Sequence, residues 1–116
     1  MAEIDQDKVR KDFDEAVNMT AAEIEKWLRT DESREVGYKG ADGSSGESVG
    51  HASGRRIVKI LRKRNADLTT DDYAHMRKVV GYIRRHSAQR PANVYTSRWR
   101  YSLMNWGHDP TKEEER

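Results

Sequence analysis

Lysine and arginine are the residues of this sequence that could do chemistry, because their number and placement would attract anions. Residues 49–100 contain 13 of them and only three acids, whereas residues 1–48 contain 13 acids and seven Lys or Arg. The formal net charge of +2 therefore hides an acidic half and a basic half. This division favours either a polyanionic partner or a basic surface partly covered by the chain's own acidic end.

The densest group of cations falls on one predicted helix, which begins at Ser48 or Ser53 and ends near Arg64. At roughly 100° per residue, Ile57 and Ile60 share one side of this helix and predict a buried face. The cations gather on the opposite side, and they are Arg55, Arg56, Lys59, Arg62 and Lys63. Such a face could lie along the phosphate backbone of a nucleic acid, since each neutralised phosphate releases condensed counterions.

Further cations are expected on two other helices. They are Arg77, Lys78, Arg84 and Arg85 on a long helix, and Arg98 and Arg100 on the last one. With the first group they predict a nucleic-acid-binding surface, with duplex DNA as the preferred ligand. No helix-turn-helix with a short turn and no zinc-finger spacing is evident, so we expect little sequence specificity.

Two other interpretations of the basic face remain open. The first is a solvated helix surface, since Lys and Arg are good helix formers. Interspersed acids would favour that interpretation, but this half of the chain has almost none. The second is a protein–protein module in which the basic face receives an acidic partner, such as the acidic N-terminal helix of a second copy.

Catalysis and metal binding are not predicted. The four histidines, His51, His75, His86 and His108, are scattered, and no pair has the i, i+4 spacing of a helical metal site. There is no Cys, and therefore no thiolate ligand or thiol nucleophile. His108 beside Asp109 could support acid–base chemistry, but a turn that ends a helix explains the pair more simply. We expect neither an enzyme nor a bound cofactor.

Small residues at the start of the basic helix allow two explanations. The run from Gly50 to Arg56 could hold an anion at a helix N-terminus. Close packing explains it as well, because an interior Gly costs about 1 kcal/mol relative to Ala and usually has a packing reason. Since Gly81 lies on the long helix, we expect that helix and the basic helix to approach each other through Gly50, Gly54 and Gly81.

The fold class follows from the apolar pattern, which has a 3.6-residue period throughout. Four helices are predicted besides the basic one: Asp5 to Asn18, Thr20 to about Arg29, a long helix over residues 68–91, and about Thr96 to Trp106. Thr20 with Glu23, and Thr69 with Asp72, have capping-box spacing at two helix starts. The prediction is an all-α single domain over residues 1–116, with four to five helices around the long one.

Composition predicts where the core and the irregular segments lie. With 34% hydrophobic residues, the core must rest on a few large side chains, so Trp27, Trp99 and Trp106 are expected to be largely buried. Glycine and serine fill residues 31–50, which predicts a flexible connector. Residues 111–116 are expected to be a disordered tail.

The expected location is cytoplasmic, either nucleoid-associated or nuclear. No apolar run approaches the ~20 residues that a membrane span needs. The N-terminus lacks the basic and apolar regions of a signal peptide. No membrane partner is therefore predicted.

Three stretches carry a resemblance to a known family: residues 46–61 (GESVGHASGRRIVKIL), 72–86 (DYAHMRKVVGYIRRH) and 99–110 (WRYSLMNWGHDP). They resemble a family of short bacterial and fungal proteins of unknown function, over about residues 21–112. Some members of that family are labelled DNA-binding, and this implication agrees in direction with the charge pattern. The resemblance implies no catalytic site or reaction.

Overall fold

A computed structural model describes residues 5–36 and 48–114 of the chain, and within these residues every regular element is helical. In chain order the elements are α1 (Gln6–Ala16), α2 (Ala21–Leu28), α3 (Asp31–Glu35), α4 (Val49–Leu61), the 3-10 helix η1 (Asn65–Asp67), α5 (Thr70–Ser87), α6 (Arg98–Asn105) and α7 (Thr111–Glu114). The predicted all-α class is confirmed. Among the described residues, no helix is both long enough and apolar enough to cross a membrane.

Two helices begin with the predicted capping box. The Thr20 hydroxyl accepts from the Glu23 N–H at 3.1 Å, while the Glu23 carboxylate accepts from the Thr20 N–H at 2.8 Å. Thr69 and Asp72 make the same two bonds at 3.1 and 3.0 Å at the start of α5. Each box satisfies N–H groups that have no partner within the helix, and so defines where the helix begins.

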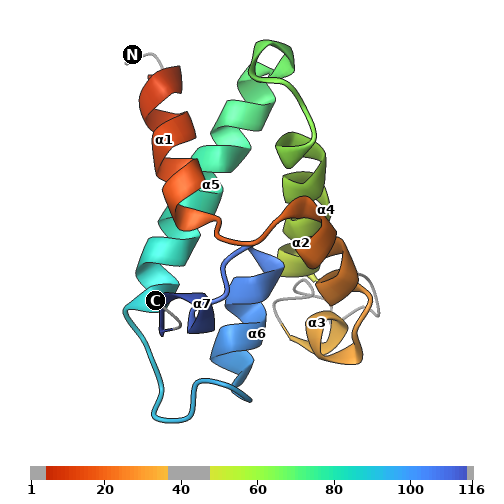
Figure 1. Ribbon diagram of the computed structural model, residues 1–116, viewed down its shortest axis with the longest axis vertical. Coiled ribbons are helices and arrows are strands. Elements are labelled where there is room, and N and C mark those ends of the chain that lie inside the picture. Colours follow the sequence, from red (N-terminus) through yellow and green to blue (C-terminus); the bar gives the residue numbers. More distant parts are fainter. Residues whose placement is uncertain (1–4, 37–47, 115–116) are drawn as a thin grey trace.

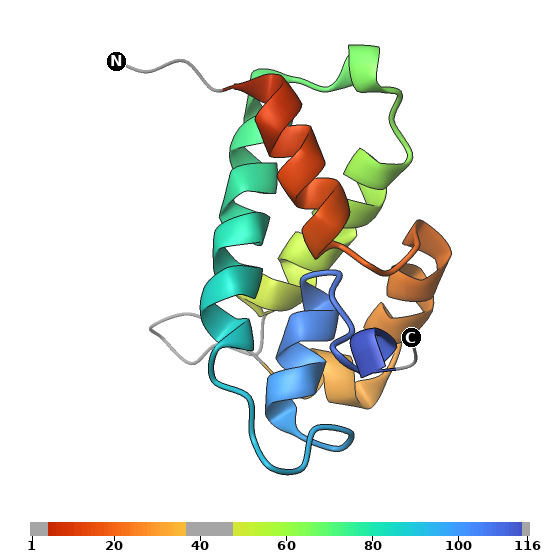
Figure 2. The same cartoon turned by 60° about the vertical axis from the view of Figure 1, so that its left-hand side comes forward.

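The helices form two packed groups that meet at α4. The helices α4 and α5 run in opposite directions and are joined by η1, and α1 lies along α5 (Figure 1). The helices α2 and α3 instead pack mainly on α4 and α6, as a rotated view also shows (Figure 2). α5 is the longest helix, but an arrangement of all other helices around it is not evident.

The core is continuous across both groups. Its most completely buried large side chains include Phe13 of α1, Ile24 of α2, Ile57 of α4, Met76 of α5 and Leu103 of α6. Each lies on the apolar stripe of its helix, so the 3.6-residue pattern correctly identified the buried faces.

The glycines of α4 permit a close approach, but not to the expected neighbour. A Cβ at Gly54 would lie 2.6 Å from the Asn105 carbonyl oxygen and 2.8 Å from Leu28 Cδ2. A Cβ at Gly50 would lie 3.0 Å from Trp106 Nε1. The small residues therefore let α4 pack on α2 and the end of α6, so the predicted glycine contact between α4 and α5 is wrong.

A glycine ends α6, as predicted. Gly107 has a φ of +84°, in the left-handed region that favours glycine. The Gly107 N–H donates to the Met104 carbonyl at 3.0 Å, and the His108 N–H donates to the Leu103 carbonyl at 3.0 Å. These two bonds form a Schellman motif, which turns the chain sharply toward α7.

The predicted connector and tail are partly ordered. Residues 31–35 form α3 and Val36 is buried. Ser48 is the buried N-cap of α4, and residues 49–50 belong to that helix. The remainder of the predicted connector, residues 37–47, lies outside the described residues. At the other end Thr111 is buried, and Lys112 Nζ contacts the Glu23 carboxylate at 2.7 Å. Residues 115 and 116 of the predicted tail also lie outside the described part.

All three tryptophans are largely buried, as predicted, and Trp106 is the most completely buried, at 4% exposure. Trp27 and Trp99 are partly buried and pack against the edge of the core. Their indole N–H groups donate to Asn105 Oδ1 at 2.7 Å and to the His86 carbonyl at 2.6 Å. Each ring thus packs its apolar part inward while its polar atom is satisfied.

Candidate nucleic-acid interface

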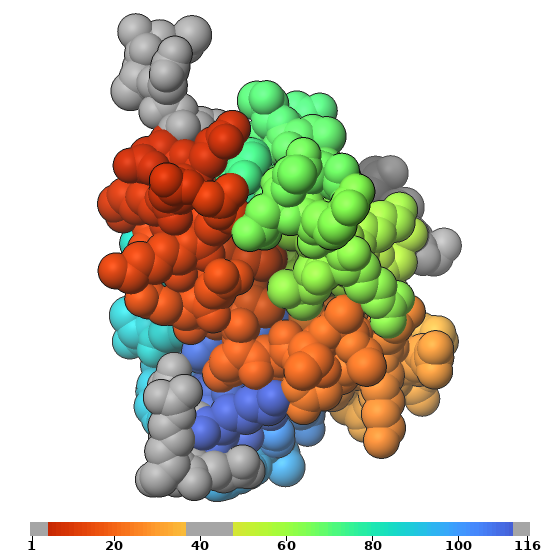
Figure 3. All heavy atoms as spheres, turned by 45° about the horizontal axis from the view of Figure 1, so that its top comes forward, coloured from red at the N-terminus to blue at the C-terminus, as the bar shows by residue number. Residues whose placement is uncertain are grey.

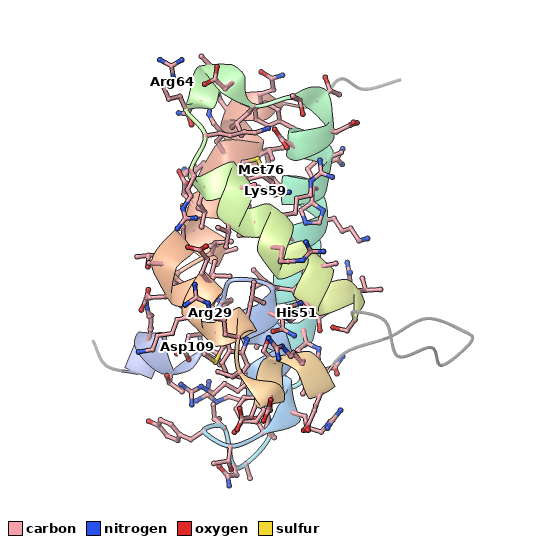
Figure 4. The ribbon with its side chains drawn as sticks, turned by 90° about the vertical axis from the view of Figure 1, so that its right-hand side faces the viewer. Arg29, His51, Lys59, Arg64, Met76 and Asp109 are labelled. Atoms are coloured by element: carbon pink, nitrogen blue, oxygen red, sulfur yellow. The ribbon has the colours of Figure 1, made fainter. Side chains whose placement is uncertain are left out.

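The outer face of α4 and the two residues after its end carry the five cations that the sequence predicts on this helix. Arg55, Arg56, Lys59, Arg62 and Lys63 are all exposed, whereas the opposite side of the helix is buried through Ile57 and Ile60. Figure 4 labels Lys59 on α4, which lies in front of α5 in that view.

A pocket of about 320 Å³ lies on this face, and its lining residues are Ala52, Arg55, Arg56, Lys59, Lys63 and Asp72. Three cations of α4, together with Lys63 just after its end, thus surround one carboxylate from the first turn of α5. The lining remains positively charged overall. A pocket of this composition can attract an oxyanion such as phosphate.

Asp72 is the acid within the basic cluster. Its carboxylate lies 2.6 Å from Lys63 Nζ and 3.5 Å from Arg56 Nη2, and only 7% of its side chain is exposed. Burial alone would raise the pKa of Asp72, but hydrogen bonds from Lys63 and Thr69 outweigh it and lower the pKa to about 2. Asp72 is therefore ionised at neutral pH and offsets part of the positive charge.

His75 links this cluster to α5. Its Nε2 lies 2.9 Å from Ser53 Oγ. Burial, followed by the positive charges of Arg56 and Lys78, lowers the pKa of His75 to about 4. The ring is therefore neutral at neutral pH, and its electrostatics indicate that Lys78 of α5 and Arg56 of α4 act on the same region.

The remaining predicted cations of α4 and α5 fall into two classes. Arg62 pairs with Glu25 of α2, and Arg84 lies 3.5 Å from the Asp12 carboxylate of α1. The others are exposed and form no ion pair within the described part of the chain; they are Lys59, Arg77, Lys78 and Arg85. The second class retains its full charge toward solvent.

Arg100 of α6 does not join this surface. Its guanidinium is bound to the Asp109 carboxylate at 3.1 and 3.2 Å and to the Tyr95 carbonyl at 2.8 Å, and only 21% of its side chain is exposed. Arg98 is exposed and donates to the Glu35 carbonyl at 3.3 Å. Figure 4 labels Asp109, the partner of Arg100, far from Lys59.

The pair His108 and Asp109 closes the turn that follows α6. His108 Nδ1 lies 2.7 Å from the Ala16 carbonyl, and the Asp109 N–H donates to Asn18 Oδ1 at 2.7 Å. Burial would raise the pKa of Asp109, but hydrogen bonds from Arg100 and Thr111 lower it overall. Both residues are buried, so their contacts favour the structural explanation of the pair.

The acidic N-terminal helix lies on α5, not on the basic face of α4. Arg10 of α1 donates to the Tyr73 hydroxyl at 2.9 Å, in addition to the contact between Asp12 and Arg84. Seen from above, α1 lies on the left and the segment around η1 on the right (Figure 3). Within one molecule, α1 therefore neutralises part of α5 and leaves the α4 cluster uncovered.

Sequence reasoning identified Asp72 only as a helix cap and did not place His75 at the site. One signal was available for Asp72, because it is one of only three acids in residues 49–100. No local signal could have found His75. Its placement depends on the contact between α4 and α5, and its partner Ser53 is 22 residues away in the chain.

Known proteins place the chain in a family without assigning an activity. No curated protein and no solved structure matches it. Among the described residues, no group of three or more His, Asp or Glu side chains is arranged to hold a metal ion. The family model described as "Protein of unknown function (DUF3140)" matches residues 12–104, which run from α1 through most of α6. The chain therefore belongs to this family of proteins of unknown function.

Proposed function

We propose that the protein is a non-catalytic nucleic-acid-binding protein that contacts the phosphate backbone of duplex DNA with little sequence specificity. The interface is the basic cluster, defined as Arg55, Arg56 and Lys59 of α4, Lys63 just after its end, and Arg77 and Lys78 of α5. The observation that carries the proposal is a pocket whose described lining contains four of these cations, Arg55, Arg56, Lys59 and Lys63, and a single carboxylate. Such a protein would be found with the nucleoid, or in the nucleus of a eukaryote.

We expect the predicted cations to contribute unequally to DNA binding. Arg62 and Arg84 belong to ion pairs with α2 and α1, so they would contribute less to DNA binding than the cations that have no ion-pair partner among the described residues. Arg85 lies further along α5 and would extend the interface, while Arg98 and Arg100 belong to the distant α6. The strongest contributions are therefore expected from Lys59 and Lys78, which are exposed and have no ion-pair partner among the described residues.

The test is a titration of a fluorescent random-sequence duplex, followed by anisotropy at several salt concentrations. The logarithm of the affinity should fall linearly with the logarithm of the salt concentration, by about 0.9 per phosphate contacted. The double variant Lys59→Glu, Lys78→Glu should bind all sequences more weakly and flatten this slope by about 2.

A charge-matched control separates the interface from net charge. Lys11 of α1 and Lys26 of α2 are exposed and have no ion-pair partner among the described residues. The double variant Lys11→Glu, Lys26→Glu changes the net charge equally and should retain most of the affinity and the slope. Equal losses in both double variants would argue against a defined interface. Absence of binding at low salt would overturn the proposal.

A second candidate function is self-association through opposite charges. Asp14 and Glu15 on the outer side of α1 are exposed, while the basic cluster lies on other elements, so two copies could pair an acidic and a basic surface. Sedimentation velocity should then show association at low salt that high salt abolishes. Asp14→Lys should weaken that association and leave DNA binding intact or stronger.

A further inference from the structure

The pocket between α4 and the first turn of α5 places three cations around Asp72. Arg56 and Lys59 of α4 and Lys63 just after its end follow one another at spacings of three and four residues, and all three line the pocket, so they are neighbours in space. Like charges at this spacing destabilise a helix unless an anion lies among them. Among the described residues, Asp72 is the only anion of the pocket lining.

The contacts of Asp72 leave donor capacity in the cations. A lysine ammonium has three donors and an arginine guanidinium has five. Asp72 lies inside, with 7% of its side chain exposed, whereas its partners Lys63 and Arg56 are 36% and 43% exposed. The carboxylate therefore holds the inner side of both cations and leaves their outer side open to a second oxyanion.

Lys59 completes the arrangement from the rim of the pocket. It lines the pocket, is exposed, and has no ion-pair partner among the described residues. Because a water molecule occupies about 30 Å³, a pocket of about 320 Å³ has room for a hydrated phosphate group. An anion bound there would contact Lys59 together with the outer donors of Arg56 and Lys63.

We propose that this pocket is a binding site for one phosphate group, held by Arg56, Lys59 and Lys63, and that Asp72 competes with the phosphate for two of these cations. The inference rests on the proposed function, in which the phosphate belongs to the nucleic-acid backbone. It adds the position of one anchoring phosphate and the residue that limits its affinity.

Asp72 limits affinity because it remains charged. With a pKa of about 2, it keeps its negative charge at any pH near neutrality and repels an incoming phosphate at short range. In Asp72→Asn the amide oxygen can still accept the Thr69 N–H, which preserves the cap while the charge is removed. Asp71→Asn is the matched control, since Asp71 lies in the same helical turn but is exposed and has no ion-pair partner among the described residues.

The experiment uses the full chain and inorganic phosphate as the probe, at constant ionic strength, with amide chemical shifts as the readout. Phosphate should shift the amides around Ala52, Lys59 and Asp72 more than those of α6. Asp72→Asn should bind phosphate about three- to tenfold more tightly, whereas Asp71→Asn should change the affinity much less. Lys59→Ala should weaken binding by a similar factor, and an exposed unpaired lysine can be removed without unfolding the chain.

The outcomes separate this site from the proposed function. Equal effects of Asp72→Asn and Asp71→Asn would overturn the competition, because general charge would then explain both. Shifts confined to other surfaces would overturn the phosphate site even if the duplex binds. Phosphate binding in the pocket with the expected difference between variants, but no binding of a duplex, would support the site and overturn the nucleic-acid function. If Asp72→Asn loses its helical circular-dichroism signal, Lys59→Ala becomes the test of the site. Phosphate binding by Lys59→Ala that is as tight as that of the wild type would then overturn the site.

Discussion

Two aspartates of this protein are each bound by basic side chains, yet the two sites differ in openness. Asp109 and Arg100 have 12% and 21% of their side chains exposed, and Arg100 makes further bonds to Thr111 and Tyr95. Asp72 is as well buried, but its partners Lys63 and Arg56 remain much more exposed. The first pair holds the end of α6 in place, whereas the second leaves cations with donors to spare.

The difference comes from what surrounds each pair. Around α6, aromatic rings stack in a column in the order Trp106, Tyr82, His86 and Trp99. The ring centroids of Trp106 and Tyr82 are 4.3 Å apart, and those of Tyr82 and His86 are 5.1 Å apart. Around Asp72, the neighbours are charged side chains at the surface. Comparable pairs of charges therefore serve packing in one place and remain available to a ligand in the other.

The largest effect should come from removing the most buried ring of the column. Trp106→Ala deletes a ring that is 4% exposed and stacks on Tyr82, so the free energy of unfolding should fall by about 3–5 kcal/mol. Urea denaturation measures this change. Val49→Ala, at a residue that is 44% exposed at the start of α4, should cost far less. A comparable loss in both variants would mean that the α6 end is not the stabilising region.

The sequence predicted the elements whose signals are local. The capping pairs Thr20 with Glu23 and Thr69 with Asp72 lie three residues apart, and helix periodicity reveals the buried face of α4. The cations of α4 were placed correctly for the same reason. The spacing of residues along the chain is sufficient to predict a feature that depends on a single helix.

The sequence could not predict features that depend on distant partners. Helix α3 looks like a polar connector because its buried residue is Ser33, whose hydroxyl donates to Asn105, 72 residues away, at 2.5 Å. Arg100 looked like any other surface cation, but the fold places it against Asp109 beyond the α6 turn. The same limit concealed the contact between Ser53 and His75.

The second prediction concerns the effect of acid on the stability of the folded protein, and it tests the surroundings of His75. His75 has a pKa of about 4 in the folded protein, lowered by burial, Arg56 and Lys78 and opposed by Ser53 and Asp72, against an ordinary value of 6.5. The unfolded chain therefore binds a proton more readily. Stability should fall as the pH decreases below 6.5, and this loss should be complete below about pH 4.

The size of the acid effect follows from the two pKa values of His75. Their difference corresponds to about 3 kcal/mol at most. Burial also lowers the pKa of His86, which adds a loss of the same sign. Urea denaturation across this pH range should show a smaller loss for His75→Gln than for the wild type. An unchanged pH profile in that variant would contradict a neutral, buried His75.

The third prediction compares the closed pair with an exposed one. Asp109→Asn keeps the size of the side chain but removes the charge that Arg100 and Thr111 bind, so the free energy of unfolding should fall by about 2 kcal/mol. Because the pKa of Asp109 is lowered, its charge stabilises the fold above the ordinary range of an aspartate. The difference between variant and wild type should therefore shrink as the pH decreases through that range.

Glu25→Gln is the matched control, because it removes the same charge from the exposed pair with Arg62, in which the two side chains are 38% and 53% exposed. Solvent screens such a pair, and the gain from holding two mobile side chains together is small. Its unfolding midpoint in urea should therefore stay close to that of the wild type. If Glu25→Gln were as destabilising as Asp109→Asn, openness would not distinguish the two kinds of pair, and the argument that Asp72 leaves its cations available to a ligand would lose its physical basis.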